Sequence, residues 1–287
     1  MSGEMNLINT QNQVLDANIE TEVKRSNMSI LRLILLGILA GMFIGGGAAA
    51  SNVAMYAISN VGIARVVGGA IFPVGLMMIV FIGGELFTGD CLLILGVLDK
   101  KVKVLSMIRV LLIIFFSNMI GAMLVAVLVF FAGQYNYISG LLGAYTIKVA
   151  LSKSTMSFSS AFCSGIMCNI FVCGAVLMAS VAKDAGGKVW AIFFPILAFV
   201  VSGFEHCVAN MYYIPAGILA KSNEQYVQVA MDKYGITSEQ LAQLDWKAFF
   251  VNSSIPVTLG NIVGGMALGL VLYLIYKKLP VNRKKVS

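Results

Sequence analysis

The sequence predicts an all-α membrane protein with six transmembrane helices, arranged as an inverted repeat in which the second and fifth helices are broken. Three observations predict this fold: the composition, six long apolar runs, and two matching polar interruptions. The 287 residues are 59% hydrophobic and only 11% charged, with a mean hydropathy of +0.89. Soluble globular domains carry about twice that share of charged residues. A water-soluble enzyme is therefore not expected.

Six apolar runs are long enough to cross a hydrocarbon core of about 30 Å, which takes roughly 20 residues. They cover about 31–58, 67–97, 106–133, 157–182, 189–220 and 248–276. Residues 1–28 are polar, so no signal peptide is expected. The predicted organisation is an N-terminal segment over 1–29, a six-helix transmembrane domain over 30–277 and a basic tail over 278–287.

The basic residues predict the orientation in the membrane. Six spans place both termini on one side, and fourteen of the twenty Lys and Arg residues then fall on that side. The remaining six are Arg65, Lys148, Lys153, Lys221, Lys233 and Lys247. Because basic residues concentrate in cytoplasmic loops, both termini are expected in the cytoplasm of a plasma-membrane protein. The net charge of +7 therefore requires no nucleic-acid partner.

Two polar segments flank or interrupt the spans. Residues 4–25 are consistent with a weakly amphipathic cytoplasmic helix or with a flexible tail. Residues 221–247 contain the capping-box pattern Thr237-Ser238-Glu239-Gln240, which is typical of a short helical segment on the outer face, with a disordered loop as an equal alternative. The five cysteines have no CxxC spacing and are interpreted as small buried apolar residues.

An internal repeat relates the two halves of the chain. The second run reaches Gly83-Gly84-Glu85-Leu86-Phe87-Thr88-Gly89-Asp90, and the fifth reaches Ser202-Gly203-Phe204-Glu205-His206-Cys207-Val208-Ala209-Asn210. Asn118 and Asn261 then follow in the third and sixth runs. Three spans is an odd number, so the two copies must cross the membrane in opposite directions, as in many transporters.

The paired interruptions favour a pore. Irregular backbone at membrane depth is tolerated only where it is buried in protein or lines a cavity. Half-helices that begin at such breaks direct free N–H groups and positive dipole ends at the cavity, which favours a small anion. The alternative is that these glycine-rich breaks are packing notches between helices.

His206 is the only histidine in the chain, and it lies beside the second predicted break. An ionisable residue at membrane depth is costly, so a functional role in hydrogen bonding or proton donation to a weak-acid anion is the first hypothesis. A neutral histidine bonded between helices is the alternative. Thr88, Asn169 and Asn210 are uncharged donors suited to a narrow pore, or to bonding between helices.

Glu85 and Glu205 occupy matching positions in the two copies and are expected to bond the backbone N–H groups that the breaks expose. One histidine and no HExxH-like spacing predict no metal site, and no cofactor is expected.

Lys153, just outside the fourth run, could concentrate anions at the mouth of the pore, although a solvated lysine is the ordinary interpretation. Apolar constrictions are expected on either side of His206, with plain packing as the alternative for each residue. Their candidates are Phe72, Leu76 and Phe199 on one side, and Leu86, Phe87 and Val172 on the other.

Three motifs strongly resemble the formate/nitrite transporter family: Gly83-Gly84-Glu85-Leu86-Phe87-Thr88-Gly89, the run from Ser202 to Met211 with Ile214-Pro215, and Ile255-Pro256-Val257-Thr258-Leu259-Gly260-Asn261-Ile262-Val263-Gly264-Gly265. The resemblance covers about residues 30–277. It implies an aquaporin-like six-helix protomer that assembles as a homopentamer, with one pore in each protomer.

The resemblance also implies roles by position. Thr88 falls on the loop of the broken second helix, His206 on the central histidine that contacts the substrate, and Asn169 on its polar partner. Lys153 matches the vestibule lysine. Phe72, Leu76 and Phe199 match the outer constriction, and Leu86, Phe87 and Val172 the inner one. Glu85, Gly89-Asp90 and Cys207 depart from the formate-channel pattern, which weakens a direct transfer of formate specificity.

The predicted function is a channel or transporter for small monovalent weak-acid anions, with formate as the first candidate and proton coupling through His206. Nitrite and hydrosulfide channels are the alternatives within the family. A neutral-solute channel and a membrane-embedded redox enzyme subunit are rivals from other classes, and the enzyme would require a second metal or haem ligand that histidine cannot supply here. The expected partners are the anion, protons, the lipid bilayer and four further copies of the chain.

Overall fold

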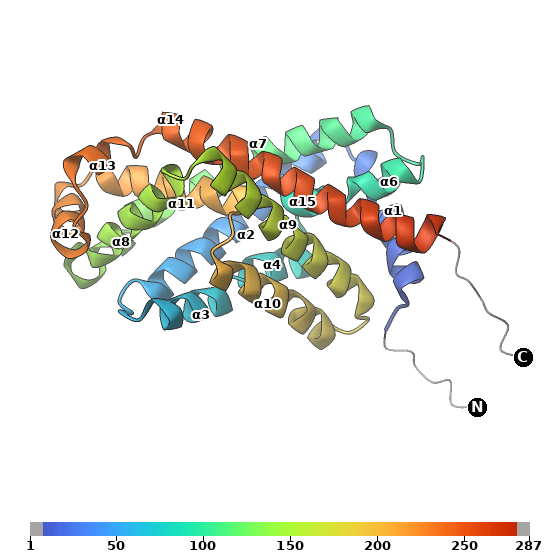
Figure 1. Cartoon of the computed structure of the whole chain (residues 1–287), viewed down its shortest axis with the longest axis horizontal. Coiled ribbons are helices and arrows are strands. Elements are labelled where there is room, and N and C mark those ends of the chain that lie inside the picture. Colours follow the sequence, from blue (N-terminus) through green and yellow to red (C-terminus); the bar gives the residue numbers. More distant parts are fainter. Residues whose placement is uncertain (1–7, 280–287) are drawn as a thin grey trace, which may run out of the picture.

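The computed structural model describes residues 8–279, and over this range the regular secondary structure is helical apart from one isolated bridge between Ile8 and Ala182. Figure 1 shows an elongated bundle in which α1 and the end of the last helix lie at one end. We call that end proximal and the opposite end distal. The elements are α1 (Gln11–Ser26), α2 (Ile30–Met55), α3 (Val61–Ile71), α4 (Val74–Ile82), α5 (Phe87–Asp90), α6 (Leu93–Leu98), α7 (Val104–Phe131), η1 (Gln134–Asn136), α8 (Tyr137–Ser154), α9 (Phe158–Val181), α10 (Ala185–Ser202), α11 (Cys207–Lys221), α12 (Glu224–Tyr234), α13 (Ser238–Ala242), α14 (Trp246–Ala248), η2 (Phe249–Ser254), α15 (Ile255–Tyr273) and η3 (Leu274–Lys278).

Six helical segments are long and apolar enough to cross a membrane, as predicted from the six apolar runs. Four of them start and end within three residues of the predicted limits. The second begins at Val61 and the fifth at Ala185, six and four residues earlier than predicted. Residues 280–287, which hold most of the predicted basic tail, lie outside the described residues, as do residues 1–7.

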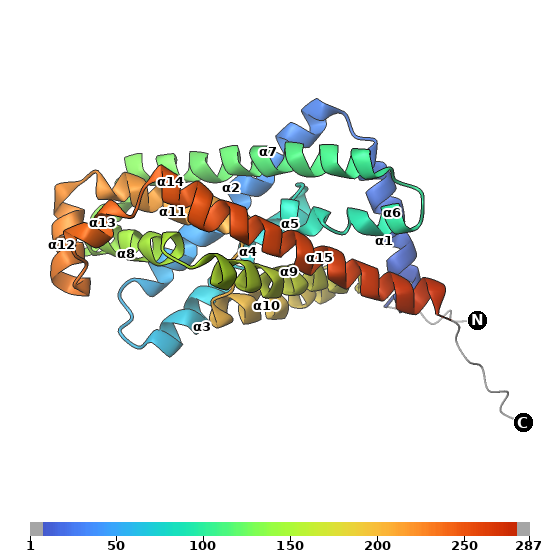
Figure 2. The ribbon, with the colours of Figure 1, turned by 45° about the horizontal axis from the view of Figure 1, so that its top comes forward.

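The two halves of the bundle are held together by matching close contacts between helices. α2 packs on α7, and a Cβ built at Gly41 would stand 2.1 Å from the carbonyl oxygen of Asn118. α9 packs on α15 in the same way, where a Cβ at Gly264 would stand 2.2 Å from the carbonyl oxygen of Ile166. Only glycine fits at either contact, since small residues are what let membrane helices approach this closely. Figure 2 shows α7 and α15 extending along the molecule, with α5 between them.

The second and fifth membrane helices are both broken, as predicted. α4 ends at Ile82 and α5 begins at Phe87, while α10 ends at Ser202 and α11 begins at Cys207. Each break opens on a glycine with positive φ, Gly83 at 110° and Gly203 at 73°, a conformation that L side chains rarely adopt. Glycine therefore determines where each helix stops.

The helices α1, α8, α12 and α13 lie outside the six apolar runs that were predicted to cross the membrane. α8 was not predicted, because its glycines and lysines dilute the apolar pattern; it carries Lys153 at the distal end. The 221–247 insertion forms α12 and α13, and Thr237 makes the predicted capping box with Gln240. Residues 11–26 form α1, which buries Leu15 and Ile19 against the proximal end. The helical alternative therefore holds for both polar segments.

Candidate functional site

The centre of the candidate site is a hydrogen bond between the two breaks. Thr88 Oγ1 lies 2.9 Å from Nε2 of His206, and both side chains are almost fully buried. The other ring nitrogen, Nδ1, accepts the Ala209 N–H at 3.1 Å, so His206 caps α11. An acceptor nitrogen carries no proton, and the neutral ring therefore holds its proton on Nε2 and donates it to Thr88.

Matching asparagines hold the two breaks in place. Asn118 Oδ1 accepts the Phe87 N–H at 2.9 Å, and its Nδ2 donates to the carbonyls of Gly37 at 2.8 Å and Glu85 at 2.9 Å. This one side chain thus ties the first break to α2. Because the donors and acceptors at a break are buried, each would otherwise remain unpaired.

The second break is tied in the same manner. Asn261 Oδ1 accepts the Cys207 N–H at 2.9 Å, and its Nδ2 donates to the carbonyls of Gly165 at 2.8 Å and Glu205 at 3.0 Å. Gly165 lies on α9, the counterpart of α2 in the other half. The matching of Asn118 with Asn261 and of Glu85 with Glu205 in the sequence therefore corresponds to equivalent contacts in the fold.

Asn169 lies behind the central pair. Its Nδ2 donates to the backbone carbonyls of Thr88 at 3.1 Å and Asn261 at 2.6 Å, and Cys173 Sγ also donates to Thr88 O at 3.3 Å. Its side chain is fully buried. In this arrangement Asn169 positions Thr88, and neither amide atom lines the cavities described below.

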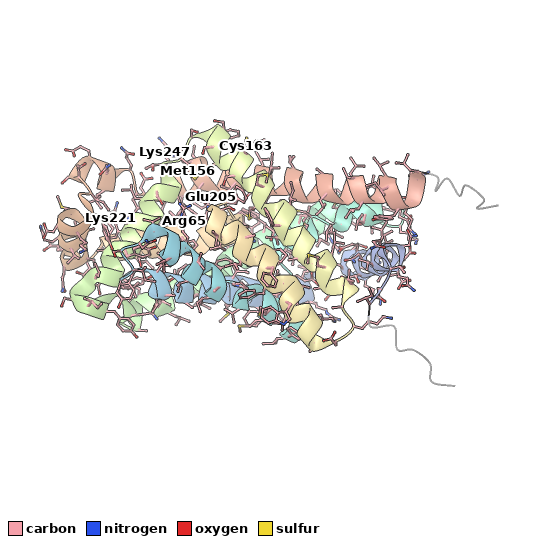
Figure 3. The ribbon with its side chains drawn as sticks, turned by 60° about the horizontal axis from the view of Figure 1, so that its bottom comes forward. Arg65, Met156, Cys163, Glu205, Lys221 and Lys247 are labelled. Atoms are coloured by element: carbon pink, nitrogen blue, oxygen red, sulfur yellow. The ribbon has the colours of Figure 1, made fainter. Side chains whose placement is uncertain are left out.

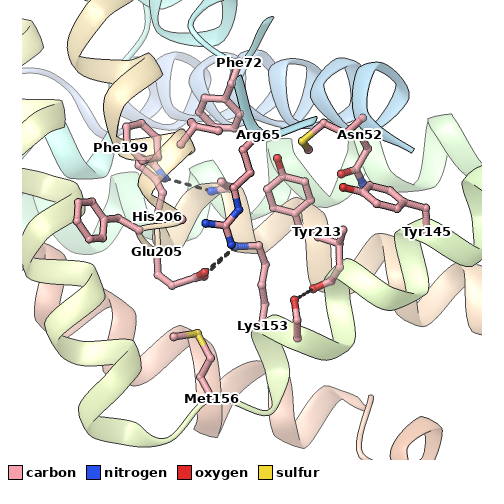
Figure 4. A pocket seen from close by; sticks show the side chains of 17 residues that line it. Asn52, Arg65, Phe72, Tyr145, Lys153, Met156, Phe199, Glu205, His206 and Tyr213 are labelled. Carbon is pink, nitrogen blue, oxygen red and sulfur yellow. Dashed lines mark hydrogen bonds and ion pairs between the residues drawn. The ribbon is translucent and has the colours of Figure 1, made fainter. Parts of the chain in front are cut away.

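A cavity of about 400 Å³ opens at the distal end and reaches His206 (Figure 4). Lys153 projects into it from α8, and its Nζ donates to both carboxylate oxygens of Glu205, at 2.8 and 3.0 Å. Asn210 Nδ2 also donates to Glu205, at 2.7 Å, and to Ser253 Oγ at 2.9 Å. Lys153, Glu205 and Asn210 therefore form one buried network beside the second break.

The glutamates do not bond the break N–H groups as predicted. The break N–H groups of Phe87 and Cys207 are taken by the two asparagines, whose side chains reach them from neighbouring helices. Glu205 instead pairs with Lys153, and Glu85 pairs with Arg25 of α1. The matching position of the two glutamates was predicted correctly, but each is the partner of a cation.

The apolar constrictions are only partly as predicted. Phe72 and Phe199 meet edge to face with centroids 5.7 Å apart, and Phe199 stacks on the His206 ring at 6.1 Å. Both phenylalanines line the inner part of the distal cavity. Leu76 belongs instead to a second cavity at the proximal end, of about 160 Å³, which Leu86 also lines.

Phe87 points away from both cavities. Its ring packs on Phe115 with centroids 5.3 Å apart and lines an apolar groove between α7 and α15. This is a correction to its assignment to the inner constriction: Leu86 is extended just before α5 begins at Phe87, and the two side chains line different hollows. Val172 is 1% exposed and packs in the core one turn from Val176, which lines the proximal cavity.

The two cavities share no lining residue, and the proximal one is covered by a residue that the sequence reasoning missed. Arg25 of α1 lines it and pairs through Nε with Glu85 and, at 3.2 Å, with Asp90. Its Nη1 donates to Glu22 at 2.5 and 2.6 Å. Three carboxylates thus surround one guanidinium. The sequence signal was a lone Arg near the end of a polar segment, which does not indicate burial.

Comparison with known proteins identifies the family. The family model for formate/nitrite transporters matches residues 12–275. The chain belongs to the formate/nitrite transporter family. The resemblance found in the sequence motifs is therefore confirmed, and the chain is a multi-pass membrane protein of a family of transporters and channels, not of enzymes.

Individual members of the formate/nitrite transporter family agree with this assignment. The chain is 37% identical over 260 residues to a probable formate transporter of Methanothermobacter thermautotrophicus, covering 84% of this chain and 87% of that protein. It is 38% identical to the formate channel FocA of Haemophilus influenzae, over 71% of each chain. A solved structure described as a pentameric formate channel with formate bound superposes with a TM-score of 0.76, at 34% identity, covering 86% of this chain and 97% of that one.

Proposed function

We propose that the protein is a pore for small monovalent weak-acid anions, with formate as its substrate. The observation that carries the proposal is the buried hydrogen bond between Thr88 and His206, placed where the two breaks meet and between two separate cavities. The relatives described as formate channels and transporters support formate over nitrite and hydrosulfide.

The hydrogen bonds of His206 suggest how an anion and a proton are coupled. Its Nε2–H is the donor nearest to Thr88, so an anion that passes the phenylalanines meets this N–H and the N-terminus of α11. Protonating Nδ1 would break its bond to the Ala209 N–H and place two donors face to face. A charged His206 is therefore favourable only with an anion beside it, which links proton uptake to anion entry.

The rings of Phe72 and Phe199 act on the hydration of the passing ion. Phe72 and Phe199 contact each other beside His206 and offer no hydrogen bonds, so a hydrated ion must leave its water behind. A weak acid can pass such a ring as the neutral molecule, whereas chloride cannot. The ring therefore favours anions that can accept a proton.

The proposed assembly is a homopentamer in the plasma membrane with both termini in the cytoplasm. The likeness to a structure described as pentameric supports the oligomer. The distribution of basic residues between the two ends supports the orientation, since it follows the positive-inside rule.

Uptake into proteoliposomes tests the proposal. Formate, nitrite, hydrosulfide and lactate are supplied separately at several pH values to wild type, His206→Asn and His206→Phe. We expect formate to move fastest, its flux to rise as the pH falls, and both variants to lose that dependence while the oligomer elutes unchanged. Formate flux that is unaltered in the correctly assembled variants would exclude the role given to His206. No flux of any anion through folded wild type would reject the pore.

A further inference from the structure

The distal cavity contains two cations and one carboxylate, and these three groups are not equivalent. Lys153 is bonded to both oxygens of Glu205, so that pair carries no net charge toward an incoming ion. Arg65 of α3 is the other cation lining the cavity. Between residues 8 and 279 it makes no ion pair, and its Nη1 donates a long hydrogen bond of 3.4 Å to the carbonyl oxygen of Val201. The net positive charge of the cavity is therefore that of Arg65.

Arg65 is an exposed residue, and its guanidinium lies beside the second break. The nearest atoms to a Cβ built at Gly203 would be Nη1, Cζ and Nη2 of Arg65, at 3.7 to 3.8 Å. Gly203 lies three residues before His206. Figure 4 shows Arg65 entering the cavity in the space between His206 and Tyr213. A guanidinium has five N–H donors, and one weak bond to Val201 leaves most of them for a ligand.

A second observation on the same wall points to a ligand. Asn52 of α2 lines the cavity and is 2% exposed, yet neither its Oδ1 nor its Nδ2 has a hydrogen-bond partner. Leaving a buried polar group unpaired is costly, and a ligand that bonds to it removes that cost. The neighbouring Ser51 bonds to the carbonyl of Gly68, which lies one helical turn from Arg65, so α2 and α3 are in contact there. Asn52 and Arg65 therefore belong to adjacent parts of one wall.

We propose that Arg65 and Asn52 form an anion-binding subsite in the distal cavity that takes a small carboxylate before it reaches the phenylalanines. The planar guanidinium matches the two oxygens of a carboxylate, and Nδ2 of Asn52 adds a further donor. Arg65 and Phe72 are seven residues apart, or about 10 Å along a helix. The subsite is thus two turns ahead of the constriction. This inference rests on the proposed function, which it deepens.

Formate uptake measured against formate concentration tests the subsite. We expect Arg65→Gln to raise the half-saturating concentration about tenfold, which corresponds to the loss of about 1.4 kcal/mol of binding, with little change in the maximal rate. Asn52→Leu should raise it by about threefold, the effect of a weaker neutral donor. Arg65→Lys keeps the charge without the planar fork and should fall between wild type and Arg65→Gln.

Lys247→Gln is the matched control. Lys247 is an exposed cation at the same end of the molecule that does not line the cavity (Figure 3). An unchanged half-saturating concentration in Arg65→Gln, or an equal shift in Lys247→Gln, would overturn the subsite while leaving the pore intact. If Arg65→Gln fails to assemble, Arg65→Lys with wild-type half-saturation would overturn it as well. Absence of formate flux in wild type would instead reject the proposed function.

Discussion

Two hydrogen bonds determine the orientation of the His206 ring, and each requires a different protonation state of its ring nitrogen. The bond from Ala209 N–H to Nδ1 requires an unprotonated nitrogen, whereas the bond at Nε2 requires an acceptor opposite it. Thr88 supplies that acceptor, and Asn169 and Cys173 fix the threonine backbone in turn. The central donor is therefore oriented before any substrate arrives, and no reorganisation is needed when an anion replaces the hydroxyl.

Thr88→Val tests whether this orientation matters. Valine has nearly the same shape but leaves the Nε2–H of His206 without an acceptor, at a cost of about 1–3 kcal/mol. The ring then keeps only the bond from the Ala209 N–H, and we expect formate flux to fall about tenfold while the assembled protein is retained, since each 1.4 kcal/mol corresponds to a factor of ten. Proteoliposome uptake measures this. Thr88→Ser keeps the hydroxyl and should retain most of the flux; equal losses in both variants would mean that the methyl group, not the hydroxyl, is required.

Among the elements, α1 has the most unusual contact with the rest of the fold. It places Arg25 in the proximal cavity, beside carboxylates from two broken-helix residues, Glu85 and Asp90, and one of its own, Glu22. Burial raises the pKa of Glu22 above its usual 4.5, and the nearby Arg25 lowers it by less. The docked helix therefore holds a carboxyl that takes up a proton more readily than a free glutamate does.

The docking of α1 should consequently weaken as the pH rises. A group whose pKa is raised on docking contributes its full stability below its free pKa, here 4.5, and loses it as the pH passes the raised value. Hydrogen exchange over residues 11–26, corrected for intrinsic rates, should show more protection at pH 5 than at pH 8. Glu22→Gln should remove most of this difference, and Glu20→Gln, on the exposed face of α1, should not. If Glu22→Gln shows the same difference in protection between pH 5 and pH 8 as wild type, Glu22 is not the group that makes docking pH-dependent.

For the whole molecule, composition and repeat patterns predict the architecture well. Six spans, two breaks and the matched Glu85 and Glu205 all follow from residues that are close together in the sequence. Side-chain partners do not, because they join distant segments: Arg25 reaches Glu85 across 60 residues, and the direction of Phe87 depends on the dihedral angles of the break. The unpredicted helix α8 packs on α11 and α12. Its sequence therefore does not need the continuous apolar surface of a helix that faces lipid.

The inverted repeat makes a quantitative prediction that concerns both halves at once. Asn118→Ala and Asn261→Ala each remove one acceptor and two donated bonds at a buried break, and leave unpaired the N–H of Phe87 or Cys207 and the carbonyl of Glu85 or Glu205. At about 1–3 kcal/mol for each unpaired group, either variant should lose several kcal/mol of stability. The two losses should be similar, because the contacts are equivalent in the two halves. Thermal unfolding in detergent measures them, with Asn252→Ala as the control, because the Asn252 side chain donates to the carbonyl oxygen of Ser154 from a more exposed position. A large loss in only one of the two halves would mean that the breaks are supported differently and that the repeat is equivalent in geometry but not in energy.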